Sequence, residues 1–131
     1  METTTDVTGN STINRIINVH NSTKSAIEVY VKGFGAYTTN STLMPCDFNS
    51  GIFRIPSKES STIPIRTVSE IGSKNSTVYR IYAHALMVKF LDDNNSEVHF
   101  PTPLDVCSEN FIVTSYMIDK KLRLIIQNED K

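Results

Sequence analysis

Apolar and polar residues alternate along much of the chain with a period of two, the pattern of a strand that buries one face. The clearest case is the segment 26–34, in which Ile27, Val29 and Val31 fall on one face. The segment 13–20 has a similar pattern, and we expect it to form the first strand.

Two pairs of apolar runs are each separated by a short polar segment. The runs 86–91 and 97–100 flank a polar turn, and the runs 111–118 and 122–127 flank Asp119-Lys120-Lys121. Both pairs are predicted to be β-hairpins. The second pair is almost continuously apolar, which is typical of strands buried on both faces. We therefore expect it at the centre of the fold, or contributing to a subunit interface.

Glycine and proline interrupt several of the runs. Pro45 and Pro64 lie inside apolar runs, and proline in a sheet is confined to edges or loops because it donates no ladder hydrogen bond. Gly33 and Gly35 either end the strand that contains them or mark a bulge where the backbone bends.

The segment 78–91 fits two patterns. A helix would place Val78, Ile81 and Ala85 on one stripe, whereas a strand would place Leu86 and its alternate neighbours on one face. The first residues of the segment are strong β-formers. We favour two strands or one long bulged strand, with a short helix around 78–86 as the alternative.

These patterns together predict an all-β fold. Eight or nine short strands, with turns every 8 to 14 residues, are typical of a single antiparallel β-sandwich, either jelly-roll-like or Ig-like. We expect residues 13–131 to form this one domain, and residues 1–12, which are polar and lack a period, to form a flexible N-terminal tail.

The tripeptide Asn-Ser-Thr occurs four times, at Asn10, Asn21, Asn40 and Asn75. Asn and Ser side chains form hydrogen bonds to their own backbone and favour turns, so these tripeptides are interpreted as turns between strands. With Asn94 they also make five glycosylation sequons. The chain begins with a polar, acidic segment that lacks the features of a signal peptide, so we attribute the sequons to composition.

The composition of the chain argues against two classes, nucleic-acid-binding and helical membrane-spanning proteins. The net charge of -1 gives no sign of the broadly basic surface of nucleic-acid-binding proteins. No run approaches the length of about 20 apolar residues that spans a bilayer. We therefore expect a cytoplasmic protein.

Catalytic and metal-binding signatures are weak. The three histidines, His20, His84 and His99, lie in separate predicted strands at no ligand spacing. Cys46 and Cys107 belong to no metal or redox motif, and we expect reduced thiols, with a disulfide as the alternative. We expect no cofactor, no metal and no enzymatic activity.

One carboxylate-rich segment, 92–97, resembles a calcium loop. It lacks the glycine and the distant bidentate glutamate of an EF-hand, so we interpret it as a solvated hairpin turn.

Two groups of residues are candidates for ligand binding. Lys120, Lys121 and Arg123 cluster at the second predicted hairpin, where they either keep an exposed tip soluble or contact phosphates and anionic lipid headgroups. Tyr79 and Tyr82 are candidates for a sugar-binding or partner-binding face, because tyrosine combines an apolar body with a polar tip.

The last strand suggests self-association. Leu122, Leu124 and Ile126 share one face of a run without proline or glycine, and unprotected edges of this kind pair readily with other chains. We therefore expect a homo-oligomer joined through this hairpin or its outward face.

Two functions from different classes compete. The favoured one is a non-enzymatic structural or interaction protein that self-associates and binds protein partners, as a viral structural or accessory protein does. The alternative is a binding module for nucleic acid, anionic lipid headgroups or glycans. Near-neutral charge and the absence of Trp favour the first.

Overall fold

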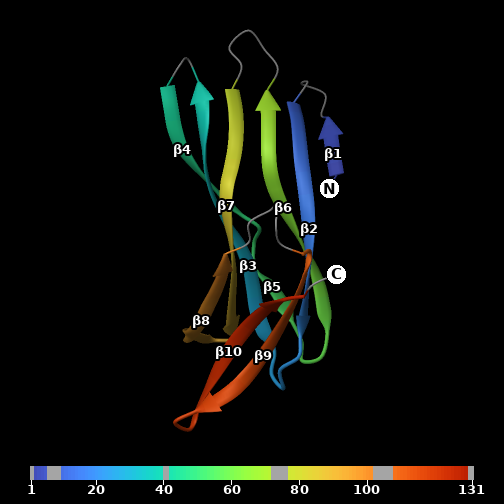
Figure 1. Ribbon diagram of the computed structural model, residues 1–131, viewed down its shortest axis with the longest axis vertical. Coiled ribbons are helices and arrows are strands. Elements are labelled where there is room, and N and C mark those ends of the chain that lie inside the picture. Colours follow the sequence, from blue (N-terminus) through green and yellow to red (C-terminus); the bar gives the residue numbers. More distant parts are fainter. Residues whose placement is uncertain (1, 6–9, 40–41, 72–76, 102–107, 130–131) are drawn as a thin grey trace.

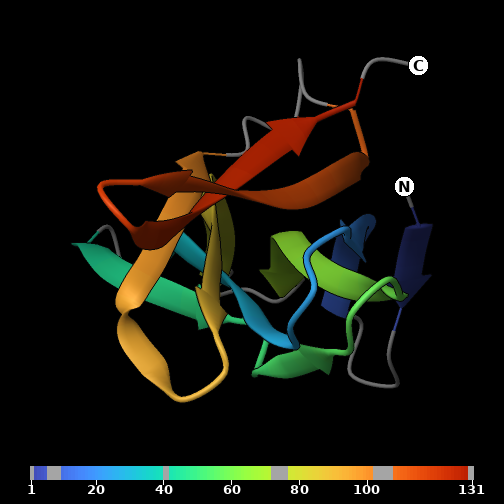
Figure 2. The same ribbon diagram turned by 90° about the horizontal axis from the view of Figure 1, so that it is seen from below.

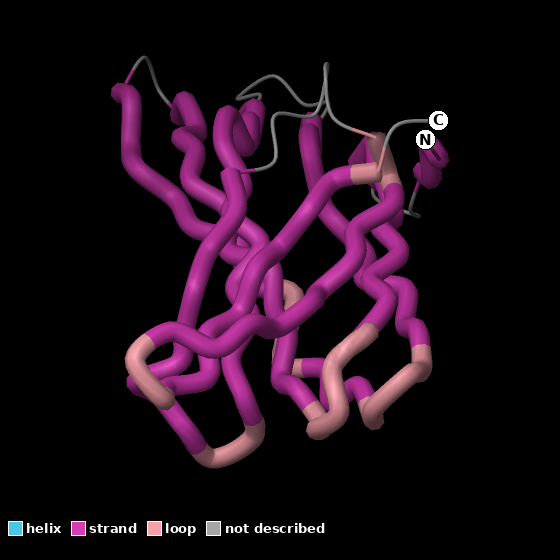
Figure 3. The backbone as a smooth tube through the Cα atoms, turned by 60° about the horizontal axis from the view of Figure 1, so that its bottom comes forward, coloured by secondary structure: helices cyan, strands magenta, loops and turns pink. Residues whose placement is uncertain are grey.

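The computed structural model is built of strands joined by short loops (Figures 1 and 3). It describes residues 2–5, 10–39, 42–71, 77–101 and 108–129. No helix long and apolar enough to cross a membrane is found among these residues. The strands are β1 (Glu2–Thr5), β2 (Asn10–Asn21), β3 (Ile27–Thr39), β4 (Thr42–Asn49), β5 (Phe53–Ile55), β6 (Ser60–Ile71), β7 (Thr77–Phe90), β8 (Asp93–Pro101), β9 (Asn110–Ile118) and β10 (Lys121–Asn128).

The strands form one hydrogen-bonded path that folds back on itself. Its order is β10-β9-β2-β6-β7-β3-β4, with β1 on β2, β5 on β3 and β8 on β7. Strands β6 and β7 pair only over 68–71 and 77–80, and beyond that point they diverge into separate layers. One layer contains β10, β9, β2 and β6, and the other contains β8, β7, β3 and β5. The predicted β-sandwich is thereby confirmed.

The core lies between these two layers. In the segment 26–34 the alternation predicted from the sequence is confirmed, because Ile27, Val29 and Val31 have no exposed surface. Each such side chain contributes about 1.5–3 kcal/mol on burial. The two layers also meet through the rings of Phe100 in β8 and Phe111 in β9, which pack edge to face at 5.4 Å. Buried apolar residues come from both layers: Ile17, Val19, Ile27, Val29, Val31, Ile55, Ile63, Ile65, Leu86, Val88, Phe90, Phe111, Val113 and Leu124.

Two strands are longer than the sequence pattern predicted, because bulges carry the chain past apparent breaks. The register of β3 against β7 shifts at Phe34 and Gly35, and β3 continues to Thr39. The bulge alternative for the glycines is therefore the observed one. The segment 78–91 lies in the single strand β7 rather than in a helix, because its backbone pairs with β3, β6 and β8.

The prolines occupy positions where no ladder donor is needed. Pro45 lies in β4, the last strand of the path, as expected for an edge. Pro64 lies in the half of β6 that pairs with β2 alone, so its other side is locally an edge. Pro56 directly follows β5.

The N-terminal segment differs from the flexible tail expected for residues 1–12. Glu2–Thr5 forms β1 and pairs antiparallel with the start of β2. Threonine is a good strand former, and pairing with β2 requires no apolar period in a strand this short. The periodicity of the sequence therefore gave no signal for β1.

Both predicted hairpins are present. Strands β7 and β8 pair with Leu86 opposite Phe100. Strands β9 and β10 pair with Lys121 opposite Ile118, and Asp119 and Lys120 in the turn have φ of 49° and 64°. Two successive residues with positive φ are the signature of a tight turn that suits the twist of the flanking strands.

The β9–β10 hairpin lies at the end of the path rather than at its centre, which corrects the sequence-based expectation. Strand β9 joins the fold through a short parallel pairing with β2, the one parallel pair among the described strands. The hairpin then crosses over the layer that contains β7 and β8 (Figure 2). Its second apolar face is therefore left in solvent instead of being buried.

The face of Leu122, Leu124 and Ile126 is the inward face of β10. Leu124 is 5% exposed and Ile126 packs against the core, so neither is a surface for a second subunit. Leu122 lies beyond the edge of the core and is 45% exposed. The apolar alternation thus reflects core packing for two of the three proposed interface residues.

The described Asn-Ser-Thr tripeptide at Asn10 lies in β2 and not in the predicted turn, whereas the one at Asn21 forms the turn after β2, as its sequence predicted. Asn21 is fully buried, and its Nδ2 donates to the carbonyl oxygens of Ser25 and Ile55 at 2.8 and 2.9 Å. Its Oδ1 accepts from the backbone N and the Oγ1 of Thr23. A glycan would be attached at Nδ2, and this atom already donates two hydrogen bonds within the fold. The sequon at Asn21 is therefore a structural turn. Asn40 and Asn75 lie outside the described residues.

Replacing Asn21 with alanine is expected to lower the free energy of unfolding by about 3 kcal/mol, because four hydrogen bonds, three of them buried, lose a partner. Asn94→Ala, at an exposed position of another sequon, is the control and should change it by less than about 0.5 kcal/mol. Urea denaturation followed by circular dichroism measures both. Equal stability of the two variants would show that the turn does not depend on Asn21.

Replacing Leu124 with alanine is expected to cost about 2–5 kcal/mol of stability, because it leaves a cavity in the core. The neighbouring inward residue, Leu122, gives the matched control, and Leu122→Ala should cost less than about 1 kcal/mol. Denaturation at low protein concentration separates this from any effect on association. Similar losses for the two variants would contradict the placement of Leu124 in the core.

Candidate functional site

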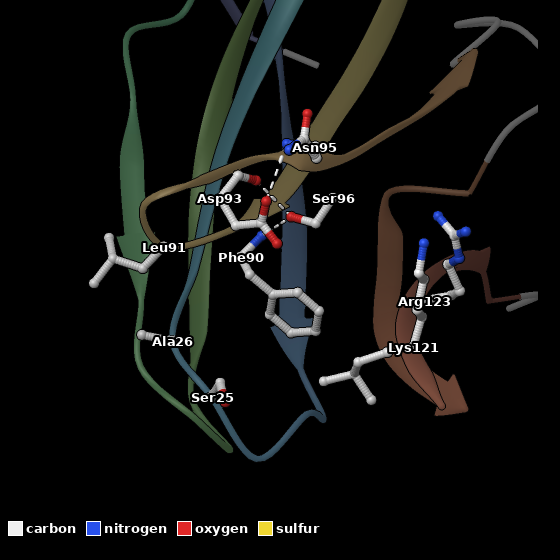
Figure 4. Close-up of a pocket in the computed structure, with 10 residues that line it drawn as sticks. Ser25, Ala26, Phe90, Leu91, Asp93, Asn95, Ser96, Lys121 and Arg123 are labelled. Carbon is white, nitrogen blue, oxygen red and sulfur yellow. Dashed lines mark hydrogen bonds between the residues drawn. The ribbon is translucent and has the colours of Figure 1, made fainter. Parts of the chain in front are cut away.

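A cleft of about 640 Å³ opens between the β7–β8 connection and β10 (Figure 4). A volume of this size is within the range of about 300–1,000 Å³ that is common for small-molecule sites. Three kinds of side chain meet in it: apolar, cationic and polar or acidic. The described residues that line it are Ser25, Ala26, Phe90, Leu91, Asp93, Asn95, Ser96, Lys121, Leu122 and Arg123.

Local hydrogen bonds fix the wall made by the β7–β8 connection. Ser96 Oγ accepts from the backbone N of Phe90 at 2.8 Å and donates to the backbone O of Asp93 at 2.7 Å. Asp93 Oδ1 accepts from the backbone N of Asn95 at 3.1 Å. Asp92 has a φ of 61°, a conformation that Asp tolerates better than most residues. The polar turn predicted over 92–96 is shorter in the structure, because β8 begins at Asp93, and the polar side chains of 93–96 hold the start of that strand.

Asp93 keeps binding capacity despite these bonds. Its Oδ2 has no hydrogen-bond partner among the described residues, and the side chain is exposed. Asp93 thus provides a charge at the mouth of the cleft that does not contribute to an ion pair within the described part of the chain.

The opposite wall carries two cations. Lys121 and Arg123 lie two residues apart in β10, so they share one face of the strand, the face opposite to that of Leu122, and both line the cleft. Both are exposed, and neither has an ion-pair partner within 4.0 Å among the described residues. Figure 4 shows them across the cleft from the β7–β8 turn. The third predicted cation, Lys120, belongs to the hairpin turn and is exposed.

Apolar side chains form the floor between these walls. Phe90 is 9% exposed and belongs to the core, while Leu122 extends past the core with about half of its surface in solvent. The cleft can therefore hold a ligand that presents charged groups to the rim and methylene or methyl groups to the floor.

The tip of the hairpin beside the cleft is unusually apolar. Tyr116, Met117, Ile118 and Leu122 are 40%, 61%, 49% and 45% exposed, respectively. In Figure 1 this tip is at the lowest point of the molecule, beyond β8. Large apolar side chains that cluster in solvent commonly mark an interaction site.

The two tyrosine candidates are not part of this site. Tyr79 and Tyr82 lie in β7, and Tyr82 precedes Phe90 by eight residues, a strand length of about 26 Å. Their side chains lie outside the described part of the structure.

The three histidines and Cys46 lie on separate strands. His84 in β7 is buried, the Nδ1 of His20 in β2 lies 2.7 Å from Ser60 Oγ, and His99 lies in β8. No group of three potential metal ligands occurs among the described residues. Cys46 lies in β4, and Cys107 is outside the described residues.

One tyrosine links the two strands that flank β7. Tyr30 in β3 donates its hydroxyl to Glu97 Oε2 in β8 at 3.1 Å. Burial, followed by this hydrogen bond and the charge of Glu97, raises the pKa of Tyr30. The phenol therefore stays a hydrogen-bond donor at neutral pH and ties β8, which carries one wall of the cleft, to β3 in the same layer.

The sequence identified both walls separately without placing them together. The carboxylate-rich turn and the basic cluster were each singled out, and the fold brings Asp93 and the pair Lys121 and Arg123 to one cleft. Sequence reasoning missed the floor, because Phe90 was interpreted only as part of a strand and Leu122 only as part of a subunit interface.

No family model matches the sequence, and no curated protein matches it. Among solved structures, a domain described as the membrane-binding domain of pneumolysin is similar to this chain, with a TM-score of 0.41 and 9% sequence identity. The similarity covers 91% of this chain and 100% of that domain.

Proposed function

We propose that the protein is a non-enzymatic binding module that docks on anionic membrane surfaces through the tip of the β9–β10 hairpin. The observation that carries the proposal is the exposure of Met117, Ile118 and Leu122 at the same turn as Lys120 and Lys121. We refer to residues 116–123 as the hairpin tip.

The apolar residues of the hairpin tip supply one part of the affinity. Met117 and Ile118 expose 61% and 49% of their surface, and their removal from water into the interfacial region is favourable. Because they lie next to a tight turn, they reach a flat surface before the rest of the domain does. A membrane surface can cover these two side chains directly, so no flexible protein partner is needed to do so.

The cations supply the second part. A lysine or arginine near an anionic bilayer contributes about 1 kcal/mol, and Lys120, Lys121 and Arg123 are all exposed at the hairpin tip. Asp119, in the same turn, offsets part of this attraction. Because the net charge of the chain is -1, the rest of its surface has no general affinity for polyanions. The attraction to anionic lipids is therefore confined to the hairpin tip.

The cytoplasm is the compartment that fits this proposal. The cytoplasmic leaflet is the negatively charged one in the cell, and the hairpin tip is complementary to it.

The proposal is non-enzymatic because the described lining of the cleft provides no activated nucleophile. It includes neither histidine nor cysteine, and the hydroxyl of Ser96 is engaged with the backbone of Phe90 and Asp93. A nucleophile needs a base within hydrogen-bond reach.

Reversing one charge at the hairpin tip is expected to weaken binding to anionic vesicles about tenfold or more. The variant is Lys121→Glu, and Arg54→Glu, an exposed cation on β5, is the control with the same change of charge. Co-sedimentation with phosphatidylcholine vesicles, with and without phosphatidylglycerol, measures the affinity at two salt concentrations. Rising salt should weaken the wild type.

A second pair of variants tests the contribution of the exposed apolar side chains to membrane binding. Met117→Ser should reduce vesicle binding, whereas Ile52→Ser, at an isolated apolar residue that is 65% exposed, should not. Binding that is insensitive to both Lys121→Glu and Met117→Ser would overturn the proposed membrane function.

Self-association with protein partners is the second candidate function. It is favoured by β10, which pairs with β9 alone and contains no proline or glycine over its length. Its outward face also exposes Ile125 beside Tyr116 of β9. A second copy that pairs with this edge would extend the sheet.

Light scattering at micromolar concentration is expected to report a dimer or larger species if β10 is an assembly edge. Glu129 N donates to Asn110 O, so odd-numbered residues of β10 donate to β9 and even-numbered residues donate to its free side. Leu122→Pro removes a donor from that free side and should yield monomers, while Leu122→Ala should keep the assembly. A wild-type monomer at these concentrations would eliminate this candidate function.

A further inference from the structure

The charges of the cleft are divided between its two walls. Asp93 is the first residue of β8, and Lys121 and Arg123 lie on β10 (Figure 4). Opposite charges that meet in a folded protein usually form an ion pair, yet Asp93 has no cation within 4.0 Å among the described residues. The cleft keeps them apart.

Both walls are held in position independently of each other. The bonds of Ser96 and Asn95 fix the backbone and Oδ1 of Asp93, and the β9–β10 ladder fixes the strand that bears the cations. A surface ion pair contributes only about 0–1 kcal/mol, so a direct salt bridge between the walls would gain little.

A ligand with both charges can bridge this gap. A single anion would meet Lys121 and Arg123 on one side but face the carboxylate of Asp93 on the other. A ligand with a single positive charge would meet the carboxylate of Asp93 on one side but face Lys121 and Arg123 on the other. A zwitterion satisfies both walls, and the apolar floor of Phe90 and Leu122 accepts its methylene groups.

We propose that the cleft holds the zwitterionic headgroup of a phospholipid, with the phosphate at Lys121 and Arg123 and the ammonium at Asp93. This inference rests on the proposed membrane function, because the exposed part of Leu122 joins the cleft to the hairpin tip that contacts the bilayer. The hairpin tip supplies general attraction to the surface, and the cleft selects the headgroup.

The test uses two soluble headgroups, one whose esterified alcohol carries an ammonium and one whose alcohol carries only hydroxyls. Glycerophosphoethanolamine and glycerophosphoglycerol share the phosphodiester, and the wild type should bind the first about fivefold more tightly. Backbone amide shifts of Asn95 and Ser96 in NMR titrations give the dissociation constants and locate the ligand. Equal affinities, or shifts confined to other parts of the domain, would overturn the proposal.

Three variants assign the roles. Asp93→Asn keeps the oxygen that accepts from Asn95 and removes the charge, so it should abolish the preference between the two headgroups. Asp92→Asn removes the same charge from the same turn outside the cleft, and should keep the preference. Arg123→Gln should weaken both ligands alike. A preference that survives Asp93→Asn would contradict the assignment of the ammonium.

The lipid origin is tested with dihexanoyl-phosphatidylethanolamine below its micellar concentration. It should bind more tightly than glycerophosphoethanolamine, and Leu122→Ser should remove this gain. Equal binding of the two would mean that the cleft takes a free headgroup and not a lipid. Because these ligands form no bilayer, their binding is measured separately from the vesicle experiment, and failure of one is distinguishable from failure of the other.

Discussion

The parallel pairing of β9 with β2 is the constraint on which the candidate site depends. It covers only a few residues and is reinforced by polar contacts: the side chain of Asn18 donates to that of Asn110 at 3.0 Å, and Ser22 N donates to the Val113 carbonyl at 2.8 Å. Arg15 and Glu109 add an ion pair at 3.4 Å. This pairing carries the last hairpin over the opposite layer, where Phe111, Val113 and Leu124 close the core. Without it the inward faces of β7 and β3 would be open to water.

The same crossing creates the cleft. The hairpin is longer than the core beneath it, so Leu124 is buried while Leu122 and Met117 extend past the opposite layer. The β7–β8 connection ends one layer, and the β9–β10 turn projects beyond it. Cationic and acidic side chains are thereby positioned across a gap that neither can close. The site is thus a geometric consequence of unequal strand lengths at one end of a sandwich.

Apolar exposure and charge act together at this end of the molecule. An apolar tip alone would favour aggregation, and a basic tip alone would be a solubilising turn. Their combination at one tight turn is the basis for the proposed membrane function. The proposed role of the cleft behind the turn is to discriminate between lipid headgroups, because its two walls differ in charge.

The pattern of the sequence predicted the local elements: strands wherever apolar residues alternate, hairpins at the polar turns, a strand end or a bulge around Gly33 and Gly35, and an edge or a loop at Pro45 and Pro64. These follow from the backbone geometry of neighbouring residues, which the sequence specifies directly. It did not determine that β2 pairs with β9, that the hairpin lies at an edge, or that Asp93 faces Lys121 and Arg123. Such pairings join residues far apart in the chain, and many strands with the same alternation would satisfy each other's hydrogen bonds equally well. Only the packing of the complete set of apolar faces in three dimensions selects one arrangement, and with it the site.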